Sequence, residues 1–196
     1  MKFLLTNTKL DFYRTGLAEI KLDALYGSWR LFAAEPLIDW ELSNSRFIVI
    51  GSIIGLRDSN GTIEGRPRIE DLKVSLAEPS KVKMVEGRFI VIKLSADGSG
   101  QVWSDQFGRA DIYFQKKGKE VYISSGLDFL PVSSRNDCDI DPVGMMQAMY
   151  IYGGRPAKKH TWYKNVKRVG VSEILDWNSN YELDLIQNPK QDIMVQ

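Results

Sequence analysis

The sequence predicts an α+β protein with a core of two sheets and helices on the outside. Residues 101–124 contain three strand-like runs joined by tight turns. Residues 46–55 form a nearly continuous run of β-branched residues, which is typical of a buried central strand. Only two stretches, near residues 69–77 and from Asp141 onwards, have helical features. Many strands with about two helices favour a two-sheet core flanked by helices.

The three strand-like runs are rich in Tyr, Phe, Ile and Val, which suits a sheet that is buried on at least one face. We expect them at Gln101–Ser104, Asp111–Gln115 and Glu120–Ser124. The first two runs are joined by an Asp-x-x-Gly turn, Asp105–Gly108, and the last two by a Gly-containing hairpin, Lys116–Lys119.

Further strands are expected on both sides of this region. Upstream, Lys2–Thr8, Trp29–Phe32 and Arg88–Leu94 are strand-like, while Leu37–Leu42 is ambiguous. Downstream, a loop at Trp162–Val169 precedes a strand at Val171–Trp177 and a last short strand at Tyr181–Leu185. We expect one domain over residues 1–185, followed by a polar tail at 186–196.

Two helices are predicted from spacing and capping. Ile69–Ala77 has apolar residues at helical spacing, and Pro79 stops it. Asp141 is expected to cap a second helix that starts at Pro142. We expect the apolar face of that helix to pack in the core, because this is the usual role of Met on a helix. The residues of this face are Val143, Met145, Met146, Met149 and Tyr150.

Composition excludes several classes of protein. The formal net charge is +1, so no acidic or basic partner is implied by the whole chain. The single cysteine, Cys138, excludes an internal disulfide framework and fits a reducing compartment. No apolar run is long enough for a signal sequence or a membrane span. We therefore expect a cytoplasmic protein that binds neither membrane nor metal.

The central region also resembles a known family, the glutaminase domain of asparagine synthetases. These are class II glutamine amidotransferases of the N-terminal-nucleophile hydrolase type. The resemblance rests on the Asp105 and Gly108 turn, Tyr113 in the following strand, and the pair Ser124 and Ser125 before a short helix. Flanking segments extend it over roughly residues 47–181. It implies an N-terminal-nucleophile-hydrolase-like αββα sandwich of two mainly antiparallel sheets.

The family's nucleophile is a cysteine at the mature amino terminus, whose free α-amino group acts as the base. Here Met1 and Lys2 occupy the first positions. Cys138 lies in a polar loop without a free α-amino group, so an ordinary structural role is favoured for it. Processing that exposed Thr6 or Thr8 would supply a new terminal hydroxyl, but it would also remove the first strand.

The oxyanion half of the family site is altered as well. The resemblance places an Asn-Gly-Glu sequence at the end of a hydrophobic strand, where the Asn amide donates to the oxyanion. The matching residues are Ile50, Gly51 and Ser52, so the donor is replaced by an aliphatic side chain and the acid by a hydroxyl. The family's glutamine-binding loops are not recognisable either. We therefore predict no catalytic residues and a vestigial pocket at these three positions.

Other candidate sites are weaker. Residues 155–168 interleave basic and aromatic side chains, which can bind nucleic acid, but a solvated loop packed on the core is favoured. His160 is the only histidine, and no partners for a triad or a metal site accompany it. The Gly51–Gly55 spacing is not a nucleophile elbow.

The functional expectation is a catalytically inactive glutaminase-like domain. It would act as scaffold or regulator of an asparagine synthetase-like, ATP-dependent, amide-forming enzyme, which is its expected partner. No cofactor is expected, and a homodimer is possible. Two alternatives stay open: residual N-terminal-nucleophile amidase or glutaminase activity, and a small-ligand sensor that uses the vestigial pocket.

Overall fold

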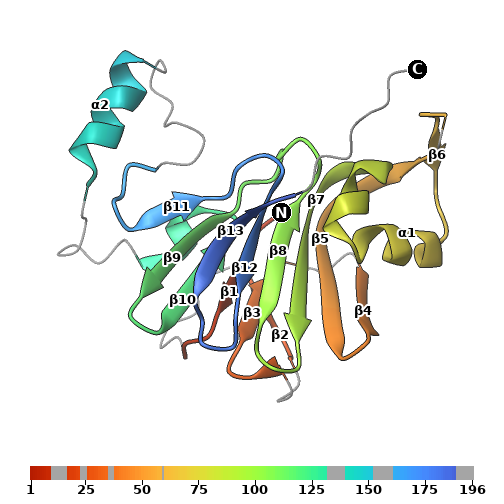
Figure 1. The fold of residues 1–196 in the computed structure, drawn as a ribbon, viewed down its shortest axis with the longest axis horizontal. Helices are drawn as coiled ribbons and strands as arrows, with labels where there is room; N and C mark the ends of the chain where they lie inside the picture. The colour runs from red at the N-terminus through yellow and green to blue at the C-terminus, as the bar shows by residue number, and fades with distance from the viewer. Residues whose placement is uncertain are drawn as a thin grey trace.

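In the computed structural model the chain forms two antiparallel sheets that pack face to face (Figure 1). The structure describes residues 1–9, 17–22, 26–34, 38–58, 60–131, 140–151 and 161–188. Every strand pair between described residues is antiparallel. The predicted α+β sandwich of two mainly antiparallel sheets is therefore confirmed.

The first sheet has six strands in the order β11-β9-β10-β1-β3-β2. The amino-terminal strand β1 lies inside the sheet, with Leu5 opposite Ile123 on one side and Leu31 on the other. The strands are β1 (Phe3–Thr6), β2 (Ala18–Ile20), β3 (Arg30–Ala33), β9 (Tyr113–Lys117), β10 (Glu120–Ser124) and β11 (Val166–Arg168).

The second sheet has seven strands, in the order β13-β12-β8-β7-β5-β4 with β6 paired to β5. Its longest strands, β5 and β7, pair over almost their whole length, with a register shift between Ile53 and Gly55. The strands are β4 (Ile38–Leu42), β5 (Ser45–Arg57), β6 (Ile63–Gly65), β7 (Val85–Ser95), β8 (Gly100–Ser104), β12 (Glu173–Trp177) and β13 (Leu183–Gln187).

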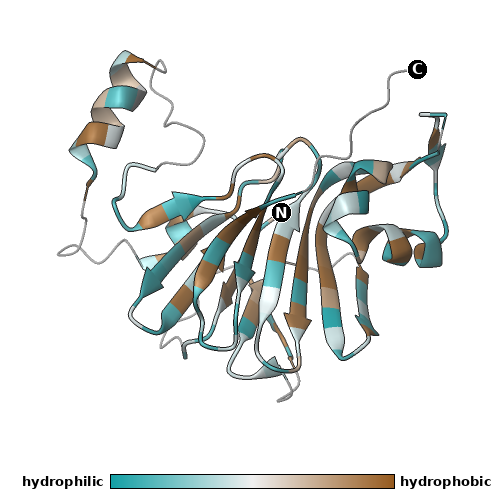
Figure 2. Ribbon diagram, viewed as in Figure 1, coloured by the Kyte–Doolittle hydropathy of each residue, from teal (hydrophilic) through white to brown (hydrophobic). Residues whose placement is uncertain are grey.

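The main core lies between the sheets and explains the alternation along each strand. Ile48 and Ile50 of β5 point into it, as do Phe3 and Leu5 of β1. The intervening residues of β5, Phe47 and Val49, point to the other face of their sheet. Hydrophobic positions run along β5, β7 and β12 in Figure 2. Burial of each such side chain contributes about 1.5–3 kcal/mol.

Helix α1 (Ile69–Leu76) covers the outer face of the second sheet. Leu72 and Leu76 pack in one cluster with Phe47 and Val49, so the predicted helix and its core-facing spacing are correct there. Ile69, at the start of the same apolar set, is instead 59% exposed. A short 3-10 helix, Pro79–Met84, continues the covering layer.

Helix α2 (Pro142–Tyr150) starts as predicted, with the Asp141 carboxylate accepting a hydrogen bond from the Val143 N–H at 3.1 Å. The prediction that its apolar face packs in the core is wrong. Figure 1 shows the helix standing off from the sheets. Its large apolar side chains are exposed, from 36% to 83%: Val143, Met145, Met146, Met149 and Tyr150.

Three further expectations need correction. The segment Trp162–Val169 is expected to be a loop, but it contains strand β11, which pairs with β9. The sequence predicts a buried central strand over residues 46–55, but only the first half of β5 is buried on both faces, and Ile54 is 64% exposed. The last strand begins at Leu183 rather than Tyr181 and ends at Gln187. Most of the expected tail, residues 189–196, lies outside the described part of the chain.

Candidate functional site

The amino terminus of the chain meets the second sheet at Gly51. A Cβ atom added to Gly51 would lie 3.1 Å from the Met1 sulfur, so the thioether packs against this glycine. Gly51 has a positive φ of 131°, and the same added Cβ would lie 2.3 Å from the Arg88 carbonyl oxygen. Only glycine therefore fits where β5 and β7 approach each other. The residue in the place of the expected nucleophile carries a thioether.

The three residues of the predicted vestigial pocket have different surroundings. Ile50 is 2% exposed and belongs to the inter-sheet core, so its side chain is enclosed by apolar neighbours. Ser52 is exposed and lies opposite Arg88 in the register of β5 and β7. The structure brings Met1 to Gly51, and it places the Ile50 side chain in the core.

The second glycine of the Gly51–Gly55 pair has a separate structural reason. A Cβ at Gly55 would lie 2.3 Å from the Glu64 carbonyl oxygen on β6. The register shift of β5 against β7 also falls there, between Ile53 and Gly55. Close backbone approach and a bulge account for this glycine without any ligand.

The Asp105–Gly108 turn joins β8 to the segment before β9 and is held by its own side chain. Asp105 is 2% exposed, and its carboxylate accepts hydrogen bonds from the Phe107 and Arg109 N–H groups at 3.0 and 3.1 Å. Gly108 has a φ of 60° and donates its N–H to the Asp105 carbonyl. All these partners are backbone groups of the turn, so the carboxylate orders the loop.

Ser124 and Ser125 fasten the amino-terminal strand. The Ser124 hydroxyl donates to the Phe3 carbonyl at 3.0 Å, and the Phe3 N–H donates to the Ser125 hydroxyl at 2.9 Å. Tyr113, on the neighbouring strand, is partly buried, and this burial, together with the nearby Asp111 carboxylate, raises the pKa of its hydroxyl. The two serine hydroxyls therefore hold β1 in place against β10.

An ion cluster lies where β5 ends and β7 begins. The Glu86 carboxylate forms ion pairs with the Arg109 guanidinium at 2.9 Å and with the Arg57 guanidinium at 3.0 Å. The Glu86 side chain is only 12% exposed. The hydrogen bond from Arg109, followed by that from Arg57, lowers the pKa of Glu86 against the opposing effect of burial. A carboxylate held ionised between two guanidinium groups is poorly suited to act as a general base near neutral pH.

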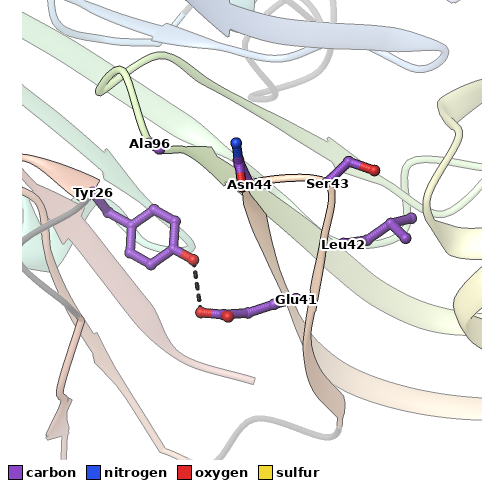
Figure 3. A pocket seen from close by; sticks show the side chains of 6 residues that line it. All are labelled: Tyr26, Glu41, Leu42, Ser43, Asn44 and Ala96. Carbon is purple, nitrogen blue, oxygen red and sulfur yellow. Dashed lines mark hydrogen bonds between the residues drawn. The ribbon is translucent and has the colours of Figure 1, made fainter.

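A hollow of about 370 Å³ lies at the other end of β5, beside the β4–β5 turn (Figure 3). The Tyr26 hydroxyl donates to the Glu41 carboxylate at 2.7 Å, and Asn44 and Ala96 complete the rim. Gly51 is six residues along the strand from Ser45, or about 20 Å at the usual rise. This hollow is therefore separate from the Gly51 region, and its one carboxylate is already hydrogen-bonded.

Several sequence candidates lie elsewhere. Cys138 and His160 fall outside the described residues, as do residues 155–160 of the basic segment. Thr6 is fully buried within β1, and its hydroxyl accepts a hydrogen bond from the Thr8 N–H at 3.2 Å. Among the described residues, no cluster of three or more metal-ligating side chains occurs. None of the described helices is long and apolar enough to cross a bilayer.

The described end of the basic segment divides into parts with different neighbours. Arg168 pairs with Asp111, and Tyr163 packs beside Tyr122. Trp162 is 46% exposed.

The exposure of α2 is a feature that the sequence did not predict. The helix Pro142–Tyr150 has no charged residue, but an uncharged run is equally typical of a buried helix, so it does not indicate exposure.

The fold defines the class of protein: a two-layer α+β sandwich of antiparallel sheets with the amino-terminal strand inside one of them. Comparisons with protein-family models and with curated protein sequences give no match. Among solved structures, the chain is similar to a glutamine phosphoribosylpyrophosphate (PRPP) amidotransferase from B. subtilis, complexed with ADP and GMP. That similarity has 11% identity and a TM-score of 0.44, and it covers 84% of this chain and 36% of that chain. This chain thus spans about a third of that protein's length.

Proposed function

We propose that the protein is a catalytically inactive glutaminase-like domain, and that it acts as scaffold or regulator of an asparagine synthetase-like, ATP-dependent, amide-forming enzyme. One observation carries the proposal. At the place where the resemblance calls for a nucleophile and an oxyanion donor, the chain has the Met1 thioether against Gly51 and the Ile50 side chain in the core.

The chemistry of amide hydrolysis explains why this arrangement supports inactivity. The reaction needs a nucleophile that can form and release an acyl group, and a thioether has no proton to lose. It also needs hydrogen-bond donors for the oxyanion, and loss of one donor lowers kcat about 10²–10³-fold. The Ile50 side chain has no hydrogen-bond donor, and it faces the inter-sheet core. Ser124 and Ser125, the nearby hydroxyls, are bonded to the β1 backbone.

The surface of α2 supports an interaction role. A helix with no charged side chain, whose large apolar residues are exposed, is typical of surfaces that another protein covers. At the start of the helix, the Asp141 N–H donates to the Trp162 carbonyl at 2.9 Å. This exposed apolar surface is the place where an amide-forming partner would bind.

The catalytic part of the proposal is tested by measuring ammonia release from glutamine, with the amino terminus of the purified protein sequenced by mass spectrometry. We expect no release above that of a heat-denatured sample. Release that is proportional to protein concentration would contradict the proposal and favour residual amidase activity. A thermal-shift screen with glutamine, asparagine and nucleotides tests the ligand-sensor alternative, because a specific ligand must raise the Tm.

The partner is tested by co-purification with an amide-forming, ATP-dependent enzyme encoded beside this protein. We expect a stable complex that is weakened by the double substitution Met146→Glu and Met149→Glu. Gln147→Glu adds charge to the same helix at a polar position and serves as the matched control. No complex in repeated trials, or equal weakening by the control, would contradict this use of α2.

A further inference from the structure

A second cavity of about 370 Å³ opens at the edge of the sandwich, and both sheets contribute to its lining. Phe114 and Lys116 come from β9, and Lys167 comes from β11 of the same sheet. Leu183 is the first residue of β13 in the other sheet. The cavity lies outside the Gly51 region and is independent of the function proposed above.

Strand geometry aims two lysines into this cavity. Phe114 is 7% exposed and belongs to the inter-sheet core. Lys116, two residues further along β9, projects from the same face of the strand. Lys167 is the register partner of Phe114 and therefore also projects from that face. Lys117 projects from the opposite face of β9.

The cavity carries an excess of positive charge. Its lining contains three lysines, at 116, 164 and 167, and one acid, Glu182, which leaves a net charge of +2. The Glu182 carboxylate accepts a hydrogen bond from the Asn178 side chain at 2.8 Å. Within the described ranges, neither Lys116 nor Lys167 takes part in an ion pair. Lys116 and Lys167 outnumber the one acid of the lining, and an anion bound between them would reduce the repulsion of their like charges.

Protection of a sheet edge explains only part of this pattern. Inward-pointing charges on edge strands prevent sheets from pairing edge to edge, and Lys167 on the edge strand β11 fits that role. Lys116 lies on β9, which has a strand on each side, and Lys164 precedes β11. These two lysines have no edge to protect in the sheet order, yet they line the same cavity.

We infer that this cavity binds a small organic phosphate or pyrophosphate. The volume falls within the range of small-molecule sites, at its lower end. Lysines bind phosphate as point charges, and a phosphate group with two or more negative charges matches the net charge of the lining. Phe114 and Leu183 supply an apolar wall for the organic part. Nucleic acid is disfavoured because Arg168, next along β11, is neutralised by Asp111.

The test is calorimetric titration of the whole chain at low salt with inorganic pyrophosphate, with glycerol phosphate and with a single-stranded RNA oligomer. We expect saturable binding of pyrophosphate and glycerol phosphate with one site per chain. The double substitution Lys116→Ala and Lys167→Ala should weaken the affinity about tenfold or more. Lys116→Arg, which keeps the charge, should retain binding.

Lys117→Ala is the matched control, because it removes the same charge from the same strand on the other face. It should change the affinity less than about twofold. Unchanged Tm values would show that the variants are folded. Absence of saturable binding by millimolar ligand, equal weakening by Lys117→Ala, or binding of the RNA alone would each overturn the inference.

Discussion

Trp29 and Trp177 donate their indole N–H groups to one acceptor, the carbonyl oxygen of Gly98, at 3.0 and 3.2 Å. Their ring centroids lie 4.9 Å apart, and both side chains are at most 3% exposed. Trp29 leads into β3 of the first sheet, and Trp177 ends β12 of the second. The turn that carries Gly98 therefore ties the two sheets together at one end of the sandwich.

This shared acceptor predicts that losses at the two tryptophans are not additive. Trp29→Phe and Trp177→Phe should each lower the free energy of unfolding by about 1–3 kcal/mol, through a lost hydrogen bond and a small void. In either single variant, the Gly98 carbonyl keeps one of its two indole hydrogen-bond donors. The double variant leaves it none, so its loss should exceed the sum by about 1 kcal/mol in urea denaturation.

The control for that coupling is Trp29→Phe combined with Tyr181→Phe. Tyr181 contacts the Trp29 ring at a centroid distance of 5.7 Å, and its hydroxyl pairs with Ser28 rather than with Gly98. Tyr181→Phe keeps the ring and removes only the hydroxyl, so the coupling between these two changes should be smaller than that between the two tryptophans. Equal coupling in both pairs would show that ring packing, and not the shared carbonyl, links the tryptophans.

The orientation of Ile50 gives a second prediction. Ile50→Asn would introduce a side-chain amide at the position where the resemblance expects one, but it would place that amide in the inter-sheet core. We expect a loss of about 3 kcal/mol in the free energy of unfolding and no gain of glutaminase activity. Ile54→Asn, at a 64% exposed position of the same strand, should cost less than about 1 kcal/mol. A stable Ile50→Asn variant that releases ammonia would contradict our account of the site.

Gly100 offers a prediction about close packing. A Cβ there would lie 2.3 Å from Cζ2 of Trp177 and 2.5 Å from the Lys93 carbonyl oxygen. Gly100→Ala should therefore lower the free energy of unfolding by about 3 kcal/mol or more. At Gly65 no atom lies within 4 Å of the added Cβ, and Gly65→Ala should be neutral or stabilising by up to about 1 kcal/mol. Thermal unfolding of both variants tests this: the Tm should fall for Gly100→Ala and stay the same or rise for Gly65→Ala.

Glu86 predicts a loss of stability in acid. Its pKa in the folded protein is lowered from 4.5, first by the hydrogen bond from Arg109. A lowered pKa means that the stabilisation is fully present above the pKa of the unfolded chain and is lost as the pH falls through the folded value. Glu86→Gln should thus destabilise the protein at pH 7, and by less at pH 3, because part of the stabilisation is lost as the pH falls. Urea denaturation at both pH values measures this, and a constant difference would contradict it.

Local patterns predicted most of the fold because the determinants were local. The cap at Asp141, the turn at Asp105 and the apolar spacing of α1 each depend on neighbours within a few residues. The strand β6 was missed, since Ile63–Gly65 is exposed and pairs only with the bulged end of β5. The exposure of α2 was missed because apolar spacing identifies a face but does not say what covers it.

The candidate site was harder to predict for a related reason. The sequence shows that Ile50 has no hydrogen-bond donor, but a run buried on both faces has no polar alternation to reveal which way each side chain points. The cavity of Lys116 and Lys167 depends on the pairing of β9 with β11, which are about fifty residues apart in the chain. Spacing within either segment alone could not bring these lysines together.

The uncovered methionines of α2 also make the helix a natural reporter. Met146 and Met149 are 61% and 62% exposed, compared with 41% for Met1 and 36% for Met145. Peroxide should oxidise Met146 and Met149 to sulfoxides fastest, and this oxidation makes an apolar surface polar. Because oxidation adds a fixed mass to each peptide, its rate would read out directly whether another molecule occludes the helix at any moment.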